Sequence, residues 1–248
     1  MAKPILLAGS ERLSGMEYCM QREPITIIGA GLVGALLATL LARRGLAVRV
    51  IEKLPDPRRA GFAGGRSINL ALAGRGYSAL RMAGLEDAVL NQAVMMRGRM
   101  LHDPHGRTEL QRYGVNDQEV IWSVSRGDLN MLLLDAAERR GAQLSFDASM
   151  VAADFEQGTI TLEHADHTRT QLRAPVLVGA DGAGSTLRKA MATQLDLGER
   201  TDMLDHGYKE LEIPPLAALA QNTRPVSAAP GARHAMDPHA LHVWPRGG

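Results

Sequence analysis

Cysteine is almost absent from this sequence. The 248 residues contain one, Cys19. A single thiol excludes an internal disulfide and a cysteine-rich metal site, and so little cysteine is in keeping with a reducing compartment. We therefore expect a cytoplasmic protein.

An excess of charge of one sign is also missing. The chain has 28 lysines and arginines against 27 aspartates and glutamates, a formal net charge of +1, and the two signs are interspersed. No basic face for a phosphate backbone stands out, which argues against nucleic acid as a partner. Apolar residues make up 45% of the chain, enough to build a sizeable core.

A continuous apolar run long enough to cross a membrane is lacking too. Ile25 to Ala42 has no charged residue and about the required length, but three glycines interrupt it. Arg43 and Arg44 follow where a signal peptide would have its cleavage site. We expect no membrane partner. Residues 1–22 show no periodicity and are predicted to be a disordered extension.

The apolar region instead predicts a βαβ unit. Ile25–Ile28 has the composition of a buried strand, Val33–Arg44 is helical in pattern, and Ala47–Ile51 alternates as a second strand. This order is typical of the opening of a Rossmann-type fold.

A GxGxxG motif, Gly29, Gly31 and Gly34, joins the first strand to the helix, and Glu52 ends the second strand. In this motif the first glycine permits a tight turn, the second lets a pyrophosphate approach the backbone, and the third allows close helix packing. The helix N-terminus stabilises the anion, and Glu52 would accept hydrogen bonds from ribose hydroxyls. The pattern predicts dinucleotide binding without distinguishing FAD from NAD.

A second glycine-rich turn follows the predicted strand Val176–Val178 and contains Asp181, Gly182, Ser185 and Arg188. Alone it would be an ordinary strand-to-helix turn. The pattern DGxxSxxR resembles a signature of the flavoprotein aromatic hydroxylases. That resemblance implies a position near the flavin pyrophosphate and favours FAD.

A third feature is Arg126, which follows Ser125 at the start of a helix predicted to run to about Arg140. A cation at a helix N-terminus is mildly unfavourable unless an anion lies beside it. In the hydroxylase family that the chain resembles, the matching arginine contacts the flavin.

Four further blocks resemble the kynurenine 3-monooxygenases within that family, in order and spacing: Gly65–Leu72, Met95–Met100, His206–Leu211 and Leu241–Pro245. The resemblance extends from about Ile25 to Gly248. It implies that Arg99 and Tyr113 bind the substrate carboxylate and that Val33, Glu52, Ala71 and Arg126 contact FAD.

Residue chemistry is compatible with these roles, because an arginine fork and a hydroxyl suit a carboxylate. Arg97 and Arg99, read as alternating positions of one strand, would equally suit a solvated strand edge. Two histidine pairs, His102 with His105 and His164 with His167, lack the carboxylates and supporting partners of a metal site, and we assign no metal.

The resemblance implies NADPH- and O2-dependent hydroxylation of L-kynurenine to 3-hydroxykynurenine, in tryptophan catabolism toward quinolinate and NAD. FAD would be bound and carry the chemistry, so no side chain is assigned as catalytic. The resemblance also implies that NADPH is a transient co-substrate, and the absence of a second Rossmann unit from this sequence is consistent with that. Two alternatives stay open: a hydroxylase of another aromatic acid, and a non-catalytic dinucleotide-binding fragment.

The predicted fold is α/β, a Rossmann-like FAD-binding domain of the aromatic hydroxylase type with part of an antiparallel substrate-domain sheet. We expect FAD-binding segments at 23–93 and 122–200, the start of a substrate-domain sheet at 94–121, and an incomplete, truncated substrate domain at 201–248. Single strands are expected at Val94–Leu101 and Thr108–Tyr113, joined by a turn at Asp103–Gly106, with later strand-like runs at Asp205–Ile213 and Ala240–Val243.

Overall fold

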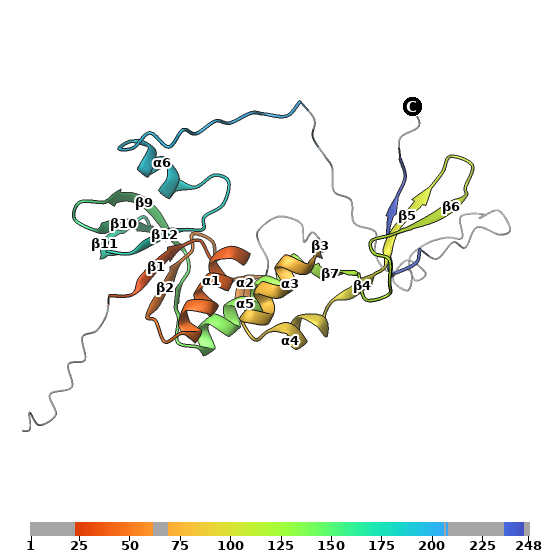
Figure 1. Cartoon of the computed structure of the whole chain (residues 1–248). Helices are drawn as coiled ribbons and strands as arrows, with labels where there is room; N and C mark the ends of the chain where they lie inside the picture. Colours follow the sequence, from red (N-terminus) through yellow and green to blue (C-terminus); the bar gives the residue numbers. More distant parts are fainter. Residues whose placement is uncertain (1–22, 62–68, 206, 208–235, 246–248) are drawn as a thin grey trace, which may run out of the picture.

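The computed structural model describes residues 23–61, 69–205, 207 and 236–245 (Figure 1). The expected extension at 1–22 and nearly all of the strand expected at Asp205–Ile213 lie outside these ranges, as do parts of two of the four resemblance blocks. Within the described residues, no helix combines the length and apolar character needed to cross a bilayer.

A four-stranded parallel sheet forms the centre of the larger lobe (Figure 1). Its strand order is β12-β1-β2-β8, so β12, the last of these four strands in the sequence, pairs with β1, the first. The bounds of these strands are β1 Ile25–Ile28, β2 Val48–Ile51, β8 Gln143–Ser145 and β12 Leu177–Gly179. The predicted βαβ opening is confirmed.

Both faces of this sheet are covered, as a parallel sheet requires. Ile27 and Val50 belong to one core cluster with the helices α1 (Leu32–Arg43) and α5 (Arg126–Arg139). Ile28 and Ile51, one residue further along each strand, belong to a second cluster on the other face. The alternation of side chains along each strand produces this division.

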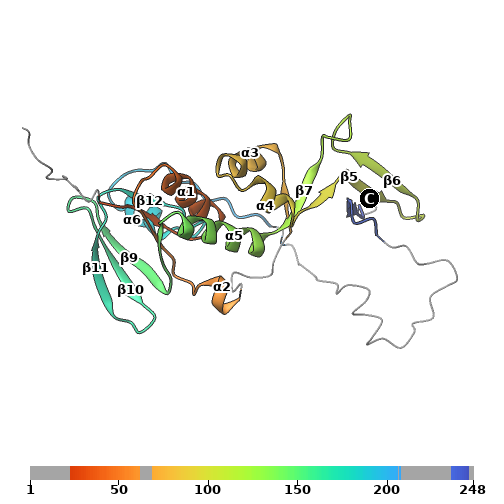
Figure 2. The same cartoon turned by 90° about the horizontal axis from the view of Figure 1, so that it is seen from below.

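The second cluster is completed by an antiparallel sheet of order β11-β10-β9 and by helix α6. The sheet lies at one end of the molecule in both views (Figures 1 and 2). The bounds are β9 Ala148–Asp154, β10 Thr159–His164, β11 Arg169–Arg173 and α6 Thr186–Ala192.

Two small sheets lead away from this lobe toward the opposite end (Figure 2). The nearer one has the order β3-β7-β4 and is antiparallel, and the farther one has the order β13-β5-β6. Their strands are β3 Asn69–Leu72, β4 Val94–Met96, β7 Ile121–Ser125, β5 Gly98–His102, β6 Thr108–Arg112 and β13 Ala240–Val243.

The expectation of one strand over Val94–Leu101 is wrong. The segment contains β4 and β5, which belong to different sheets and are separated by Arg97. Gly98 lies at the crossing: a Cβ there would come 2.2 Å from the carbonyl oxygen of Gln111. Alternation continues through Arg97, so the pattern alone does not reveal the change of partner.

Three short helices complete the described structure. α3 (Gly74–Met82) and α4 (Glu86–Leu90) pack against the first core through Leu80 and Val89. α2 (Pro57–Ala60) begins at Asp56, whose side chain accepts a hydrogen bond from the backbone N–H of Arg58. The Arg58 guanidinium forms salt bridges with Asp135 and Glu138 of α5, which fixes α2 beside that helix.

Candidate dinucleotide site

The glycine turn after β1 has the packing that its sequence predicts. Gly29 has φ of +101°, a conformation that glycine adopts without strain, and a Cβ there would lie 2.5 Å from the carbonyl oxygen of Ala180. A Cβ on Gly34 would lie 1.9 Å from the carbonyl oxygen of Gly29. Both glycines are therefore required by close backbone packing.

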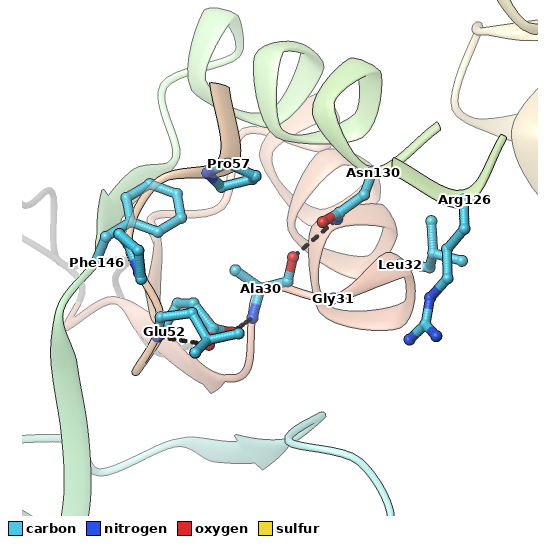
Figure 3. Close-up of a pocket in the computed structure, with 10 residues that line it drawn as sticks. Ala30, Gly31, Leu32, Glu52, Pro57, Arg126, Asn130 and Phe146 are labelled. Atoms are coloured by element: carbon cyan, nitrogen blue, oxygen red, sulfur yellow. Dashed lines mark hydrogen bonds between the residues drawn. The ribbon is translucent and has the colours of Figure 1, made fainter. Parts of the chain in front are cut away.

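Gly31 differs from its two neighbours in the motif. Among the described residues, no atom lies within 4 Å of a Cβ placed on Gly31. This open side faces a pocket that is open to solvent (Figure 3). The pocket is lined by Ala30, Gly31, Leu32, Glu52, Leu54, Pro55, Pro57, Arg126, Asn130 and Phe146.

Glu52 lies at the carboxyl end of β2 and its carboxylate reaches the glycine turn. Oε2 accepts a hydrogen bond from the backbone N–H of Ala30 at 2.7 Å, and Oε1 accepts one from Leu54 at 3.0 Å (Figure 3). A carboxylate has about four lone-pair positions, so it retains acceptor capacity toward the pocket. The remaining acceptor positions of the carboxylate suit the hydroxyl donors of a ribose.

The N-terminus of α1 opens into the same pocket. Gly31 is its N-cap, no described side chain caps it, and its first turn has no acidic residue. Val33 in that turn is 71% exposed. Uncapped N–H groups and the helix dipole suit an anion, and the space beside Gly31 lets a pyrophosphate reach the backbone. The groups that line the pocket therefore suit the adenosine ribose and the pyrophosphate of a dinucleotide.

Arg126 lines the pocket from the start of α5 (Figure 3). Ser125 caps this helix by accepting a hydrogen bond from the backbone N–H of Asp128 at 3.3 Å. The cap places the guanidinium of Arg126 at a helix N-terminus, where a nearby anion would offset the unfavourable dipole.

The second glycine-rich turn lies next to the first, because Ala180 donates a backbone hydrogen bond to Ile28 at 2.7 Å. Its Asp181 carboxylate accepts hydrogen bonds from the Ser185 hydroxyl at 2.6 Å and from the Thr186 N–H at 2.7 Å. Burial favours a higher pKa for Asp181, but these hydrogen bonds outweigh it and hold the pKa below its ordinary value.

Asp181 thus occupies the N-terminus of α6 with its own carboxylate. Arg188 is also used within the turn, since its guanidinium donates to the carbonyl of Ala183 at 2.7 Å and pairs with Glu199 at 2.8 Å. Gly182, with φ of +80°, has no described atom within 4 Å of a Cβ position. A ligand approaching this turn would meet backbone rather than a free carboxylate.

The two residues expected to bind a substrate carboxylate lie close together at the farther sheet, Arg99 on β5 and Tyr113 directly after the end of β6. The guanidinium carbon of Arg99 is 5.9 Å from the ring centroid of Tyr113. Arg99 pairs in register with Gln111 on β6, which places Arg99 and Tyr113 diagonally across two strands. Arg97 lies between β4 and β5, so its reading as a residue of one strand with Arg99 is wrong.

The predicted residues therefore fall into separate groups. Gly31, Glu52 and Arg126 line one pocket, and Asp181, Gly182 and Arg188 line a neighbouring hollow. Ala71 is exposed on β3, opposite Ser123, and is absent from the described lining of either.

Sequence reasoning missed five residues of the pocket that lie outside the glycine motif: Leu54, Pro55, Pro57, Asn130 and Phe146. Pro57 follows Asp56, a pair typical of a helix start. Asn130 is a polar position within the apolar face of α5, which is itself a signal of a buried partner. Its amide donates to the carbonyl of Ala30 at 2.9 Å.

The side chains of His102 and His164 have partners other than the second histidine of each pair. His102 bonds to His242 at 2.7 Å and stacks on Trp244 at 4.2 Å between centroids, while His164 bonds to Thr170. The described residues contain no group of three or more His, Cys, Asp or Glu side chains arranged to hold a metal.

Comparison with known proteins gives a consistent set of relatives. A family model described as an FAD binding domain matches residues 22–235. A kynurenine 3-monooxygenase of Xanthomonas axonopodis pv. citri (strain 306) is 50% identical over 229 residues, which are 92% of this chain and 48% of that protein. One from Stenotrophomonas maltophilia (strain K279a) is 49% identical over 224 residues, 90% and 46% of the two chains. The chain thus spans about half the length of the curated relatives it matches.

Solved structures with a similar fold include p-nitrophenol 4-monooxygenase from Pseudomonas putida DLL-E4, with a TM-score of 0.60 and 19% identity over 68% of this chain and 43% of that one. A ternary complex of aklavinone-11 hydroxylase with FAD and aklavinone has a TM-score of 0.55 and 25% identity over 69% and 35% of the two chains.

Proposed function

The chain belongs to the FAD binding domain family, and from this premise we propose that the complete protein hydroxylates L-kynurenine to 3-hydroxykynurenine with NADPH and O2. The choice of FAD over NAD, which the glycine motif alone left open, is confirmed by this membership. The fold is the α/β fold of FAD-binding aromatic hydroxylases, as expected.

The substrate assignment is supported by the names of relatives that are 50% identical over 92% of the chain. The geometric observation that carries it is the approach of Arg99 to Tyr113, 5.9 Å from guanidinium carbon to ring centroid. An arginine offers two parallel N–H donors to a carboxylate, and a tyrosine hydroxyl adds a third. Together they suit the carboxylate of an amino-acid substrate.

The proposed role of the chain's own residues is to bind and orient FAD. Gly31 and the start of α1 would hold the pyrophosphate of FAD, Glu52 would accept hydrogen bonds from the ribose hydroxyls, and Arg126 would contact the flavin. FAD would supply the redox chemistry when bound, with NADPH as the electron source and oxygen activated for transfer to the aromatic ring. No side chain is assigned a proton-transfer role.

This assignment divides the chain between two tasks. Residues 23–93 and 122–200 form the FAD-binding domain, and 94–121 with 201–248 belong to the substrate domain. Because the chain spans about half the length of its curated relatives, we expect it to bind FAD without supporting turnover. The complete protein is proposed to work in the cytoplasm, in tryptophan catabolism.

The test has two stages. The 248-residue chain is titrated with FAD and followed by the shift of the flavin absorbance spectrum. NADPH oxidation under air is then measured on the complete protein with L-kynurenine, salicylate or 4-hydroxybenzoate, with chromatographic detection of 3-hydroxykynurenine. Kynurenine-dependent oxidation and product support the proposal.

Two results would contradict it. Stimulation by salicylate or 4-hydroxybenzoate in place of kynurenine assigns another aromatic acid as the substrate. Failure of both the chain and the complete protein to shift the flavin spectrum leaves only a non-catalytic folded fragment.

A further inference from the structure

We propose that Asn130 is a positioning residue of the FAD site, which holds the glycine turn in the shape that receives the pyrophosphate. The proposal rests on FAD binding at the pocket described above. It assigns a function to a buried amide that is remote in sequence from both glycine motifs.

Asn130 lies on α5, one helical turn after Arg126, and is 6% exposed. Its Nδ2 donates a hydrogen bond of 2.9 Å to the carbonyl of Ala30, across 100 residues of sequence (Figure 3). Ala30 is the residue between the first two glycines of the motif. A buried amide is retained in an apolar helix face when its hydrogen bonds are satisfied, and here the partner is the turn itself.

The backbone of Ala30 is held from both directions. Its N–H donates to Glu52 Oε2 at 2.7 Å, and its carbonyl accepts from Asn130 at 2.9 Å. The peptide groups before and after Ala30 are therefore each fixed by a side chain, one from the residue that follows β2 and one from α5.

The orientation of the Ala30 carbonyl matters most for binding an anion. The peptide between Ala30 and Gly31 is free to rotate at low cost on its glycine side, because glycine tolerates backbone angles that other residues avoid. If this peptide rotated, its carbonyl oxygen would face the anion site and repel a phosphate. Asn130 holds the oxygen away from that site.

A buried hydrogen bond between helices also stabilises packing in general, and the chain offers a matched control for that effect. Thr39 is 0% exposed on α1, and its hydroxyl lies 2.8 Å from the carbonyl of Ala35 and 3.2 Å from that of Leu133 on α5. Thr39→Val removes a buried polar contact between the same two helices, remote from the glycine turn.

The experiment compares Asn130→Leu, Asn130→Asp and Thr39→Val in the full 248-residue chain. Hydrogen exchange of the backbone amides at residues 29–35 is measured without ligand, melting temperature is recorded, and FAD affinity is measured by titration. Asp keeps the shape of Asn but its carboxylate does not donate, so it provides a second variant if the leucine variant does not fold.

We expect both Asn130 variants to exchange at least about 5-fold faster at the glycine turn and to bind FAD at least about 5-fold more weakly, the effect of one hydrogen bond. Thr39→Val should lower the melting temperature while leaving turn exchange and FAD affinity within about 2-fold of the unmodified chain.

Equal losses in the Asn130 and Thr39 variants would reduce Asn130 to a packing role and overturn the proposal. Unchanged exchange at the turn in both Asn130 variants would also overturn it. If the unmodified chain does not bind FAD, the expectation that this chain binds FAD is contradicted. The hydrogen-exchange comparison still decides whether Asn130 holds the glycine turn.

Discussion

Glu52 and Ala30 are joined by a 2.7 Å hydrogen bond from the backbone N–H of the glycine turn to the carboxylate at the end of β2. The other carboxylate oxygen accepts from the N–H of Leu54 at 3.0 Å. One side chain thus ties the turn after β1 to the segment after β2, and both line the pocket. The acid at this position organises the site before any ligand arrives.

Glu52→Gln should weaken FAD binding. An amide side chain has a single oxygen, so one of the two backbone donors loses its partner and the amide group faces it with a second donor. We expect about 10-fold weaker binding, since hydrogen bonds to charged groups contribute about 1.5–3 kcal/mol. Glu156→Gln, on an exposed turn, is the control. Titration with FAD measures both, and equal affinity in the two variants would count against this role for Glu52.

Gly34→Ala should lower the stability of the fold, whereas Gly31→Ala should lower FAD affinity and leave the fold intact. The new methyl group at Gly34 would meet the carbonyl oxygen of Gly29 at 1.9 Å, and overpacking of this kind costs about 1–3 kcal/mol of stability or more. The methyl group at Gly31 meets no described atom within 4 Å, so the fold should persist while FAD affinity drops. Thermal unfolding and FAD titration separate the two, and a fold destabilised by Gly31→Ala would contradict the open-side interpretation.

Acid should destabilise the protein through Asp56 and Asp181. The side-chain hydrogen bond from Arg58 lowers the pKa of Asp56 below its ordinary value of 3.8, and hydrogen bonds outweigh burial to lower that of Asp181. A carboxylate with a lowered folded-state pKa stabilises the fold above its unfolded pKa and loses this contribution as pH falls through the folded value. We therefore expect the free energy of unfolding to be level near neutrality and to decline below pH of about 4.

Asp181→Asn isolates one part of that decline. At neutral pH it should cost about 0.5–2 kcal/mol, as for loss of a helix cap, and the decline in acid should become shallower. Asp202 forms an exposed ion pair, so Asp202→Asn should change neither the stability at neutral pH nor the decline in acid. The free energy of unfolding of each variant is measured with denaturant between about pH 2 and 7, a range that brackets the titration of carboxylates. An unchanged acid profile in Asp181→Asn would contradict the capping role.

Arg99→Gln should impair use of kynurenine by the complete protein. Loss of a charged donor to a carboxylate predicts a KM at least about 10-fold higher. Arg97→Gln is the matched control, because Arg97 is a neighbouring exposed arginine outside β5. Steady-state NADPH oxidation as a function of kynurenine concentration gives both values. Equal effects of the two substitutions would indicate a general charge effect rather than a carboxylate contact.

The glycine turn could be predicted from sequence because its determinants are local. Gly29, Gly31 and Gly34 are separated by a few residues, and Glu52 follows at the end of the next strand, so strand, turn, helix and acid are all visible in one window. Asn130 could not be connected to the turn in this way. Its partner Ala30 is 100 residues away, and only the packing of α5 against α1 brings the two together.

The sheets show the same limit. Alternation correctly predicted strands at Thr108–Tyr113, where β6 ends one residue earlier at Arg112, and at Ala240–Val243, but it does not identify a strand's partner. It therefore merged β4 with β5 across Arg97, and it gave no indication that β13 would pair in parallel with β5. Strand β7 was also missed, although Ile121–Ser125 supplies the partner of both β3 and β4.

The strand order β12-β1-β2-β8 has a consequence for synthesis on the ribosome. β1 is among the first described segments to emerge, but its neighbour β12 is made about 150 residues later, and the carbonyl of Ala180 is what packs over Gly29. During that interval β1 has one edge unpaired, and an unpaired strand edge is exposed to association with other chains. The nascent chain thus carries a nucleotide motif long before it has a nucleotide site.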